Sequence, residues 1–286
     1  MSTDSPHIAV VGSVNLDHVA RVPRLPQPGE TVTDGVLAKF PGGKGANQAL
    51  AARRLGARVS LVACVGDDAI AGEALALLRA DGVDLARLVV DPAVTTGIAL
   101  IAVDERGENQ IVVAPGANRR LSAERLAIPA ADALICQLEV PVDTLLAAAQ
   151  QFDGFFCLNL APIKEVPDAL IARADLVIVN EVEAAHYRER LQRAPGLVAL
   201  TYGSRGASLR RGAETLAEAA PPTVDAVDTT GAGDTFTAAL TLALIEKKAH
   251  AQALAFACAA AAASTTRAGA QPSLPRRAEV EELLGQ

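Results

Sequence analysis

Residues 133–201 contain four short apolar runs, ALICQL (133–138), FFCLNL (155–160), LVIV (176–179) and LVALT (197–201), and these runs decide the fold. Apolar sequence with little polar alternation is typical of parallel strands that are buried on both faces. Helical stretches separate the runs. This alternation predicts an α/β protein with helices on both sides of a mostly parallel sheet, a three-layer α/β/α sandwich.

The N-terminal part of the chain adds elements of the same kind. Ile8–Val11 predicts a first strand, and Val59–Val65 predicts a further buried strand. Helices are expected over about 45–56 and about 72–80. A chain of 286 residues can bury roughly 75% of its unfolded surface, so we expect one domain over residues 1–286.

Two segments do not fit this alternation. The stretch at about 16–40 is polar and punctuated by proline, and the runs 97–103 and 110–113 flank a polar turn in the manner of a β-hairpin. Together, about 16–40 and 95–115 predict a small separate sheet that acts as a lid. Such a sheet has one uncovered face, which either closes over a ligand or pairs with another subunit.

Composition narrows the partners of the protein. The net charge of −7 and the pI of about 5.2 argue against nucleic acid or an anionic membrane as the main partner. The first residues do not resemble a signal peptide, and the longest apolar run, 253–263, is too short to span a bilayer.

The cysteines and histidines do not form a metal-binding or disulfide pattern. Cys64, Cys136, Cys157 and Cys258 each lie in an apolar stretch and show no C-x-x-C spacing, while the four histidines are scattered. This pattern predicts buried free thiols in a cytoplasmic protein.

Residues 228–236, DTTGAGDTF, place two glycines and an aspartate directly before an apolar helical stretch. Gly231 and Gly233 permit a tight turn whose N–H groups, at the positive end of a helix, favour phosphate. The negative charge of Asp234 opposes an anion at this site, so its presence needs a functional reason. A base that takes a proton from a hydroxyl attacking a phosphoryl group supplies that reason. The block therefore predicts a phosphotransferase with an alcohol acceptor, and the structural alternative is a capping aspartate.

Polar residues also follow several predicted strands, where open parallel sheets bind ligands. Asn15 and Asp17 follow the first strand, and Glu139 follows the run 133–138. Small polar side chains at this position suit sugar hydroxyls. The alternatives are an Asx turn at 15–17 and a solvated carboxylate at Glu139.

The segment GGKGAN at 42–47 opens a predicted helix. It is not a Walker A loop, because Lys44 is followed by glycine, and no G-x-G-x-x-G follows the first strand. A dinucleotide-dependent dehydrogenase therefore has no support. Asn47 stands out on an otherwise Ala/Leu helix and favours a ligand site, although a flexible turn with a solvated lysine is an alternative.

Two further strand ends carry polar residues. Asn180-x-x-Glu183 matches a helix capping box and can also reach nucleotide phosphates and a hydrated Mg²⁺. The segment Thr201–Gly206 follows the last of the four runs. It is either a turn between strands or part of a nucleotide site.

Taken in their order along the chain, these segments resemble the ribokinase family of carbohydrate kinases (the PfkB group). The resemblance covers about residues 8–275. It rests on the segments GSVNLD (12–17), PGET (28–31), GGKGANQ (42–48), GDD (66–68), QLE (137–139), NEVE (180–183), DTTGAGDTF (228–236) and TRAGAQPS (266–273). The chain departs from the family in reading NLAP at 159–162, where Asn-Pro-Ala-Pro is usual, and in a short 184–196 segment.

The resemblance implies ATP-dependent phosphorylation of D-ribose at its 5-hydroxyl. The sugar would be held by Asn15, Asp17, Gly43, Lys44, Asn47 and Glu139, with Asp234 as the base and the N–H groups of Gly231, Ala232 and Gly233 as an anion hole. ATP would contact Asn180, Thr201, Gly203, Gly206 and Gly233, and Glu183 would place Mg²⁺ through water. An activating K⁺ would bind at Asp228, Thr230, Ser264, Arg267, Gly269 and Ser273, and the lid would form a homodimer.

Other functions remain open at this point. The same chemistry could act on 2-deoxyribose, another small sugar or a nucleoside, although aromatic residues are only 3% of the chain and tryptophan is absent. A non-catalytic sugar or nucleotide sensor is a remote alternative, because a sensor has no need for Asp234 or for the glycines on either side of Ala232.

Overall fold

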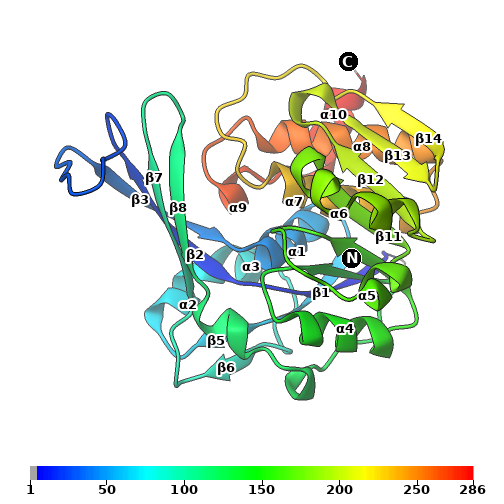
Figure 1. Ribbon diagram of the computed structural model, residues 1–286, viewed down its shortest axis with the longest axis horizontal. Helices are drawn as coiled ribbons and strands as arrows, with labels where there is room; N and C mark the ends of the chain where they lie inside the picture. Colours follow the sequence, from blue (N-terminus) through cyan, green and yellow to red (C-terminus); the bar gives the residue numbers. More distant parts are fainter. Residues whose placement is uncertain (1–4, 286) are drawn as a thin grey trace.

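The computed structural model describes residues 5–285 and is built around a sheet of eight strands (Figure 1). The strand order is β14-β13-β12-β11-β10-β9-β1-β4, in which β13 and β14 are antiparallel additions to a parallel sheet. These strands are β1 (His7–Val11), β4 (Arg58–Val62), β9 (Ala133–Gln137), β10 (Phe155–Asn159), β11 (Leu176–Asn180), β12 (Leu197–Thr201), β13 (Ala207–Arg211) and β14 (Glu214–Ala219).

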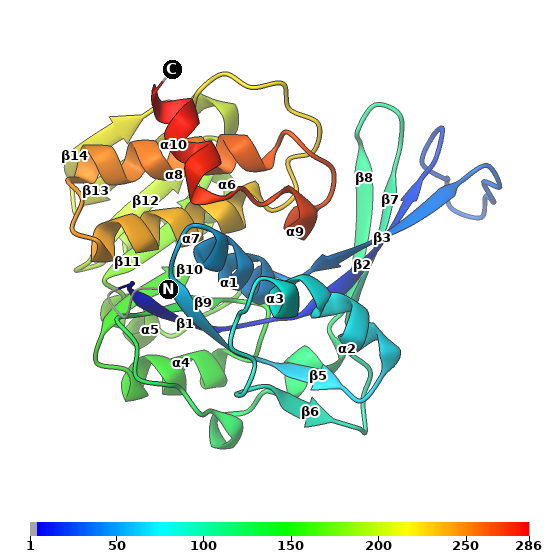
Figure 2. The same ribbon diagram turned by 180° about the vertical axis from the view of Figure 1, so that it is seen from behind.

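Helices cover both faces of this sheet. Figure 2 shows α1, α7, α8 and α10 over one face, and α4, α5 and α6 lie over the other (Figure 1). Along β1, Ile8 and Val10 enter one buried cluster, whereas Ala9 and Val11 enter the second, as the two-residue period of a strand requires. The helices are α1 (Lys44–Arg54), α2 (Ala69–Ala74), α3 (Ala76–Ala80), α4 (Val142–Gln151), α5 (Asp168–Arg173), α6 (Glu181–Gln192), α7 (Ala232–Ile245), α8 (His250–Ser264), α9 (Ala270–Ser273) and α10 (Arg277–Gly285).

A second sheet projects from the end of β1 (Figure 1). Its order is β3-β2-β7-β8, formed by β2 (Asn15–Arg21), β3 (Val36–Gly42), β7 (Gly97–Val103) and β8 (Asn109–Ala114). This sheet contains the excursion and the hairpin that the sequence predicts, and we call it the lid. A two-stranded sheet of β5 (Cys64–Gly66) and β6 (Val89–Asp91) lies beneath it, and short 3₁₀ turns occupy 116–120, 123–125 and 203–205.

The structure confirms the three-layer sandwich and corrects two of its elements. The predicted strand Val59–Val65 is two strands, because the chain leaves β4 after Val62 and pairs through β5 with β6. The predicted helix over 72–80 begins earlier, since the Asp68 side chain accepts the N–H of Ala71 and caps α2 at residue 69, and it is divided into α2 and α3. Among residues 5–285, no helix has the length and apolar character needed to cross a membrane.

Candidate active site

The carboxyl ends of the parallel strands bring the predicted site residues to one edge of the main sheet. Asn15 and Asp17 begin β2 directly after β1, Glu139 follows β9, Asn180 ends β11 and Thr201 ends β12. These ends lie beside the start of α7 and the base of the lid (Figure 1). The position follows from parallel topology, because every strand of the set ends at the same edge.

The glycine block starts α7 as predicted. Gly231 is the N-cap and has a left-handed backbone with φ of +83°, a conformation that glycine adopts without strain. Asp234 therefore lies in the first turn, near the positive end of the helix dipole. One of the three predicted anion-hole amides, that of Ala232, already donates to the carbonyl of Thr229 at 3.2 Å.

Asp234 is only 5% exposed, and both of its carboxylate oxygens are hydrogen-bonded. Oδ2 accepts from Nδ2 of Asn47 at 2.9 Å, and Oδ1 accepts from Nε2 of Gln48 at 2.9 Å. The Lys44 ammonium lies 4.0 Å from Oδ1. Burial raises the pKa of Asp234 above its ordinary value, although Lys44, Asn47 and Gln48 favour the charged form and oppose this shift.

Glu139 is linked to the same group of residues through Lys44 and Ser13. Oε2 of Glu139 accepts a hydrogen bond from the Ser13 hydroxyl and another from the Lys44 backbone N–H at 3.0 Å. The negative charge of Asp234 raises the pKa of the Lys44 ammonium, with smaller contributions from Glu139 and Glu183 and with burial acting against it. Lys44 is therefore a fixed positive charge between three carboxylates.

Asp17 is buried close to the same groups, and among residues 5–285 it forms no ion pair with a cationic side chain. Its carboxylate lies against Gly42, where an added Cβ would come 2.2 Å from Oδ2, so a side chain at that position would displace the carboxylate. Burial raises the pKa of Asp17 to about 7, with further contributions from the negative charges of Glu139 and Asp234. The neighbouring Asn15 is held by Nδ2 of Asn118, which donates to Asn15 Oδ1 at 2.8 Å.

Four amide side chains that sequence reasoning did not assign to the site support these groups. They are Gln48, Asn118, Gln137 and Asn159, and all four are buried. Gln48 could have been predicted, because it is a polar residue on the same Ala/Leu helix as Asn47. Asn118 belongs to a 3₁₀ turn far away in the sequence, and only the fold shows that it meets Asn15.

On the other side of α7, a cavity of about 400 Å³ lies beside the start of the helix. Its wall includes Thr201, Gly203, Gly206 and Gly233, as the sequence predicts for a nucleotide site. The remaining lining is mostly small or apolar, and it comes from the 221–226 segment, Ser204, Thr229, Ala232, Phe236, Cys258, Ala261, Ala262 and Thr265.

Asn180 and Glu183 form the predicted capping box at the start of α6. Oδ1 of Asn180 accepts the Glu183 N–H at 2.9 Å, and Oε2 of Glu183 accepts the Asn180 N–H at 2.8 Å. Burial raises the pKa of the Glu183 carboxyl, which also interacts electrostatically with Lys44 and Asp234. Glu183 thus faces the site while it caps its helix.

The predicted K⁺ residues lie on the loop before α7 and on the segment from the end of α8 to the end of α9, and Asp228 joins these two segments. Oδ1 of Asp228 accepts the Thr230 N–H at 2.9 Å, and Oδ2 accepts the Gly269 N–H at 2.9 Å. The guanidinium of Arg267 donates to the Ser273 carbonyl at 3.0 Å, so this predicted ligand already faces a positive charge. Ser264 is buried at the end of α8.

The donor groups fit metal ions that are bound partly by substrate. Within the described residues, no group of three or more His, Cys, Asp or Glu side chains is arranged to hold a metal. One carboxylate, Glu183, fits Mg²⁺ held through water and substrate phosphates. For a monovalent cation the two segments offer the Asp228 carboxylate and backbone carbonyls, of which that of Ser273 already accepts from Arg267.

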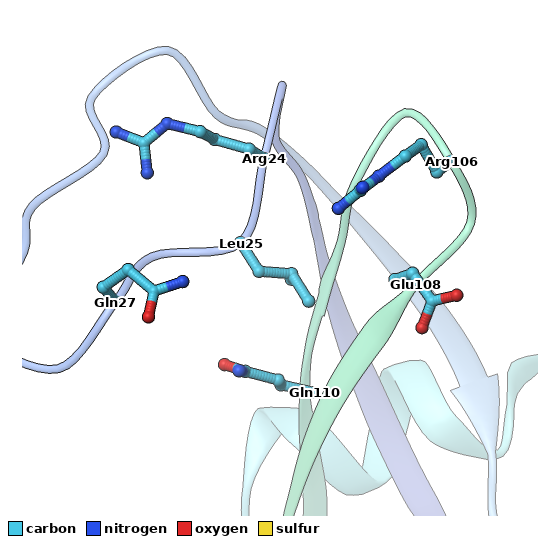
Figure 3. Close-up of a pocket in the computed structure, with 6 residues that line it drawn as sticks. All are labelled: Arg24, Leu25, Gln27, Arg106, Glu108 and Gln110. Atoms are coloured by element: carbon cyan, nitrogen blue, oxygen red, sulfur yellow. The ribbon is translucent and has the colours of Figure 1, made fainter.

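A second hollow, of about 510 Å³, lies at the tip of the lid (Figure 3). Arg24 and Gln27 reach it from the β2–β3 loop, and Arg106, Glu108 and Gln110 reach it from the β7–β8 hairpin. Both arginines already pair with carboxylates, Arg24 with Glu30 and Arg106 with Asp104. This hollow contains none of the predicted site residues.

Comparison with known proteins gives the family of the chain. The model of the pfkB family carbohydrate kinases matches residues 5–277. The chain belongs to the pfkB family of carbohydrate kinases. It is 37% identical over 301 residues to the ribokinase of Haemophilus influenzae, covering 97% of this chain and 98% of that protein.

Solved structures of family members have the same fold. The ribokinase of Thermotoga maritima superposes with a TM-score of 0.91 at 33% identity, covering 98% of this chain and 100% of that one. Arabidopsis thaliana ribokinase complexed with ribose and ATP gives a TM-score of 0.87 at 29% identity, covering 99% of both chains. The family assignment and the three-layer fold with its lid are therefore confirmed.

Proposed function

We propose that this protein catalyses the ATP-dependent phosphorylation of D-ribose at its 5-hydroxyl, giving ribose 5-phosphate and ADP. The observation that carries the proposal is the position of Asp234. Its buried carboxylate lies in the first turn of α7 among polar side chains, and the two residues before it, Ala232 and Gly233, line the cavity. A general base must lie within hydrogen-bond reach of the acceptor hydroxyl, and that hydroxyl must face the γ-phosphate, so a carboxylate next to the lining of the cavity suits this role.

The polar residues around Asp234 bind the sugar in this proposal. Asn15, Asp17, Gly43, Lys44, Asn47 and Glu139 supply donors and acceptors for the sugar hydroxyls. Oδ1 of Asn47 is buried and lacks a hydrogen-bond partner within the described structure, so it is available to accept from a hydroxyl. Lys44 donates to hydroxyl oxygens while it keeps Asp234 charged.

Asp234 then removes the proton from the 5-hydroxyl. The freed oxygen forms a bond to the γ-phosphorus of ATP, the bond from that phosphorus to the bridging oxygen breaks, and ADP leaves with its electron pair. The proton remains on Asp234 until it is released to solvent. A pKa raised by burial suits this role, because it makes the carboxylate a stronger base near neutral pH.

The cavity beside α7 binds ATP. Thr201, Gly203, Gly206 and Gly233 line it, and Asn180, which does not line it, pairs with Thr201 in the main sheet and would contact ATP from there. The N–H groups of Gly231, Ala232 and Gly233 stabilise the charge on the transferring phosphoryl group. The Ala232 amide must give up its bond to Thr229 to take part.

Two metal ions complete this proposal. Mg²⁺, held by Glu183 through water, would supply positive charge next to the phosphates. K⁺, held by oxygen atoms of Asp228, Thr230, Ser264, Arg267, Gly269 and Ser273, would order the two loops that flank the anion hole. Asp228 already fastens these loops together through its bonds to Thr230 and Gly269.

The lid would form the contact of a homodimer. It carries exposed apolar side chains on β3 and β8, including Val36 at 69% and Val112 at 65% exposure. Exposed apolar area of this kind favours association with a second copy.

The four cysteines are free and buried, which fits the cytoplasm as the compartment.

A panel of acceptors in an ADP-release assay tests the proposed activity. D-ribose is expected to give the highest kcat/KM, and KCl is expected to stimulate turnover relative to a tetramethylammonium salt. A preference for 2-deoxyribose or a nucleoside would change the substrate and keep the mechanism. A lack of turnover with every sugar and nucleoside, together with tight sugar binding, would favour the sensor alternative.

A further inference from the structure

Three buried amide side chains lie directly beneath Asp234. Gln48 belongs to α1, Gln137 ends β9 and Asn159 ends β10, so three separate elements supply them. Gln48 and Gln137 are completely buried, and Asn159 is nearly so. Burying an amide costs free energy unless its hydrogen bonds are made inside the protein. Neighbours satisfy both polar atoms of Gln48 and of Asn159 and the NH₂ of Gln137, whereas the buried Oε1 of Gln137 lacks a partner within the described residues.

The direction of each hydrogen bond follows from Asp234. A carboxylate only accepts hydrogen bonds, so the group 2.9 Å from its Oδ1 must be the NH₂ of Gln48. Nε2 of Gln48 also donates to Oδ1 of Asn159 at 3.2 Å. The Gln48 carbonyl oxygen then faces Gln137, whose Nε2 donates to it at 2.7 Å. Reversing either glutamine would place two oxygen atoms against each other.

Asn159 is fixed in the same way. Its Nδ2 donates to the backbone carbonyl of Ile178 on β11 at 3.2 Å, so its Oδ1 is the atom that faces Gln48. Each N–H of the Gln48 amide thus has one acceptor, and one of these acceptors is a carboxylate. The Gln48 side chain consequently has a single orientation, set by strands β9, β10 and β11.

From this arrangement we infer that Gln48, oriented by Gln137 and Asn159, is a positioning residue that holds the Asp234 carboxylate in one rotamer with an oxygen lone pair free for the acceptor hydroxyl. The inference rests on the proposed function of Asp234. Gln48 acts through Asp234 and has no assigned contact with substrate. Orienting the base lowers the barrier to proton transfer, because a general base acts only within hydrogen-bond reach.

Charged groups from four elements also face Asp234. They are Lys44 on α1, Asp17 on β2, Glu139 after β9 and Glu183 on α6. Within the described structure none of them is hydrogen-bonded to Gln48, whose Nε2 donates to Asn159 and Asp234, so substitution of Gln48 removes no hydrogen bond from them. Loss of the Gln48 bond removes stabilisation from the charged form of Asp234 alone.

The test is the pH dependence of kcat for Gln48→Leu with the acceptor that the wild-type enzyme prefers. We expect kcat to fall at least about tenfold, the KM for the sugar to change less than about threefold, and the acid limb to move up by about one pH unit. Gln137→Leu removes a hydrogen bond to Gln48 and none to Asp234. It should shift the acid limb of the kcat profile in the same direction by a smaller amount.

Thr241→Val is the matched control. Thr241 is buried on α7, and its hydroxyl donates to the Thr237 carbonyl at 2.8 Å, two turns beyond Asp234. Its loss costs stability and should leave the pH profile unchanged. If Gln48→Leu does not fold, the isosteric Gln48→Glu takes its place; a second carboxyl group against Asp234 should move the acid limb further up.

The results separate the two proposals. A wild-type enzyme that phosphorylates no alcohol refutes the proposed function. An active wild type with an inactive Asp234→Asn supports it. If, in that case, folded Gln48→Leu or Gln48→Glu shows the wild-type kcat and acid limb, Gln48 is not a positioning residue and the inference alone is overturned.

Discussion

The proposed sugar half and the proposed nucleotide half of the site differ in composition. The sugar half consists of charged and amide side chains that are buried and fixed by specific hydrogen bonds, with Asp234 at the centre. The nucleotide half is a cavity whose wall is mostly glycine, small apolar side chains and backbone. The difference indicates that the first half works through individual side chains, whereas the second half works through the shape of its cavity.

Asp234→Asn should break the sugar half most severely. Asparagine keeps the size of the side chain but cannot take a proton, so kcat is expected to fall by about 10²–10⁴-fold. Binding of ATP should change little, because the nucleotide cavity is untouched. Steady-state kinetics and calorimetric titration measure the two effects, and a kcat within a few-fold of wild type would remove Asp234 from the mechanism.

Asp17→Asn should weaken sugar binding while it increases the stability of the folded protein at high pH. Because the pKa of Asp17 is raised to about 7 in the folded protein from 3.8, the native state holds this proton more tightly than the unfolded chain does. The contribution of Asp17 to stability is therefore present at low pH and is lost as the pH rises from about 4 to about 7. Asparagine does not ionise, so the variant escapes this loss.

The expected gain in the free energy of unfolding of Asp17→Asn at pH 8 is at most about 4 kcal/mol, and it should vanish near pH 4. The KM for the sugar should rise at least about tenfold, since a charged acceptor is lost. Thermal unfolding at several pH values measures the first effect. A stability difference that does not change with pH would contradict the assigned state of Asp17.

Ala261→Phe should break the nucleotide half by shape alone. Ala261 on α8 lines the cavity, and a benzyl group there would fill part of its 400 Å³. The KM for ATP is expected to rise about tenfold or more while the KM for the sugar stays within about twofold. Ala251→Phe, at an exposed position of the same helix, is the control. Equal effects of the two substitutions on ATP would show that the cavity does not bind the nucleotide.

Asn180→Ala should have the smallest effect of these four. It removes the side-chain half of the capping box of α6, which costs about 1 kcal/mol of stability, and it should raise the KM for ATP only a few-fold. Asp68→Ala is the comparison, because Asp68 caps α2 away from the cavity. If both substitutions raise the KM for ATP alike, the change reflects general destabilisation and not a nucleotide contact.

The sequence predicted the sandwich and the lid because the pattern of apolar residues and the position of turn residues depend on local structure. The start of α7 was also predictable, since Gly231 and Gly233 mark it. The amides beneath Asp234 were not predicted, because Gln137 and Asn159 look like isolated polar residues in apolar strands. Only the parallel order of β9, β10 and β11 brings them to Gln48.

Element boundaries were predictable only in part. The end of α1 was close to its expected position before Gly56, whereas the division into β4 and β5 depends on a partner strand, β6, that lies more than twenty residues further along the chain. Likewise, the pKa of Asp17 results from burial and from charges on other elements. Properties that depend on contacts between distant segments cannot be read from local sequence.

The account depends most on the claim that a sugar hydroxyl, activated by Asp234, receives the γ-phosphate of ATP. The most direct measurement is a ³¹P NMR time course of the wild-type protein with ATP, MgCl₂, KCl and D-ribose. We expect the γ-phosphate signal to be replaced by that of ribose 5-phosphate, in equal amount to the ADP formed. Formation of inorganic phosphate alone, or unchanged ATP with every sugar and nucleoside acceptor, would contradict the claim.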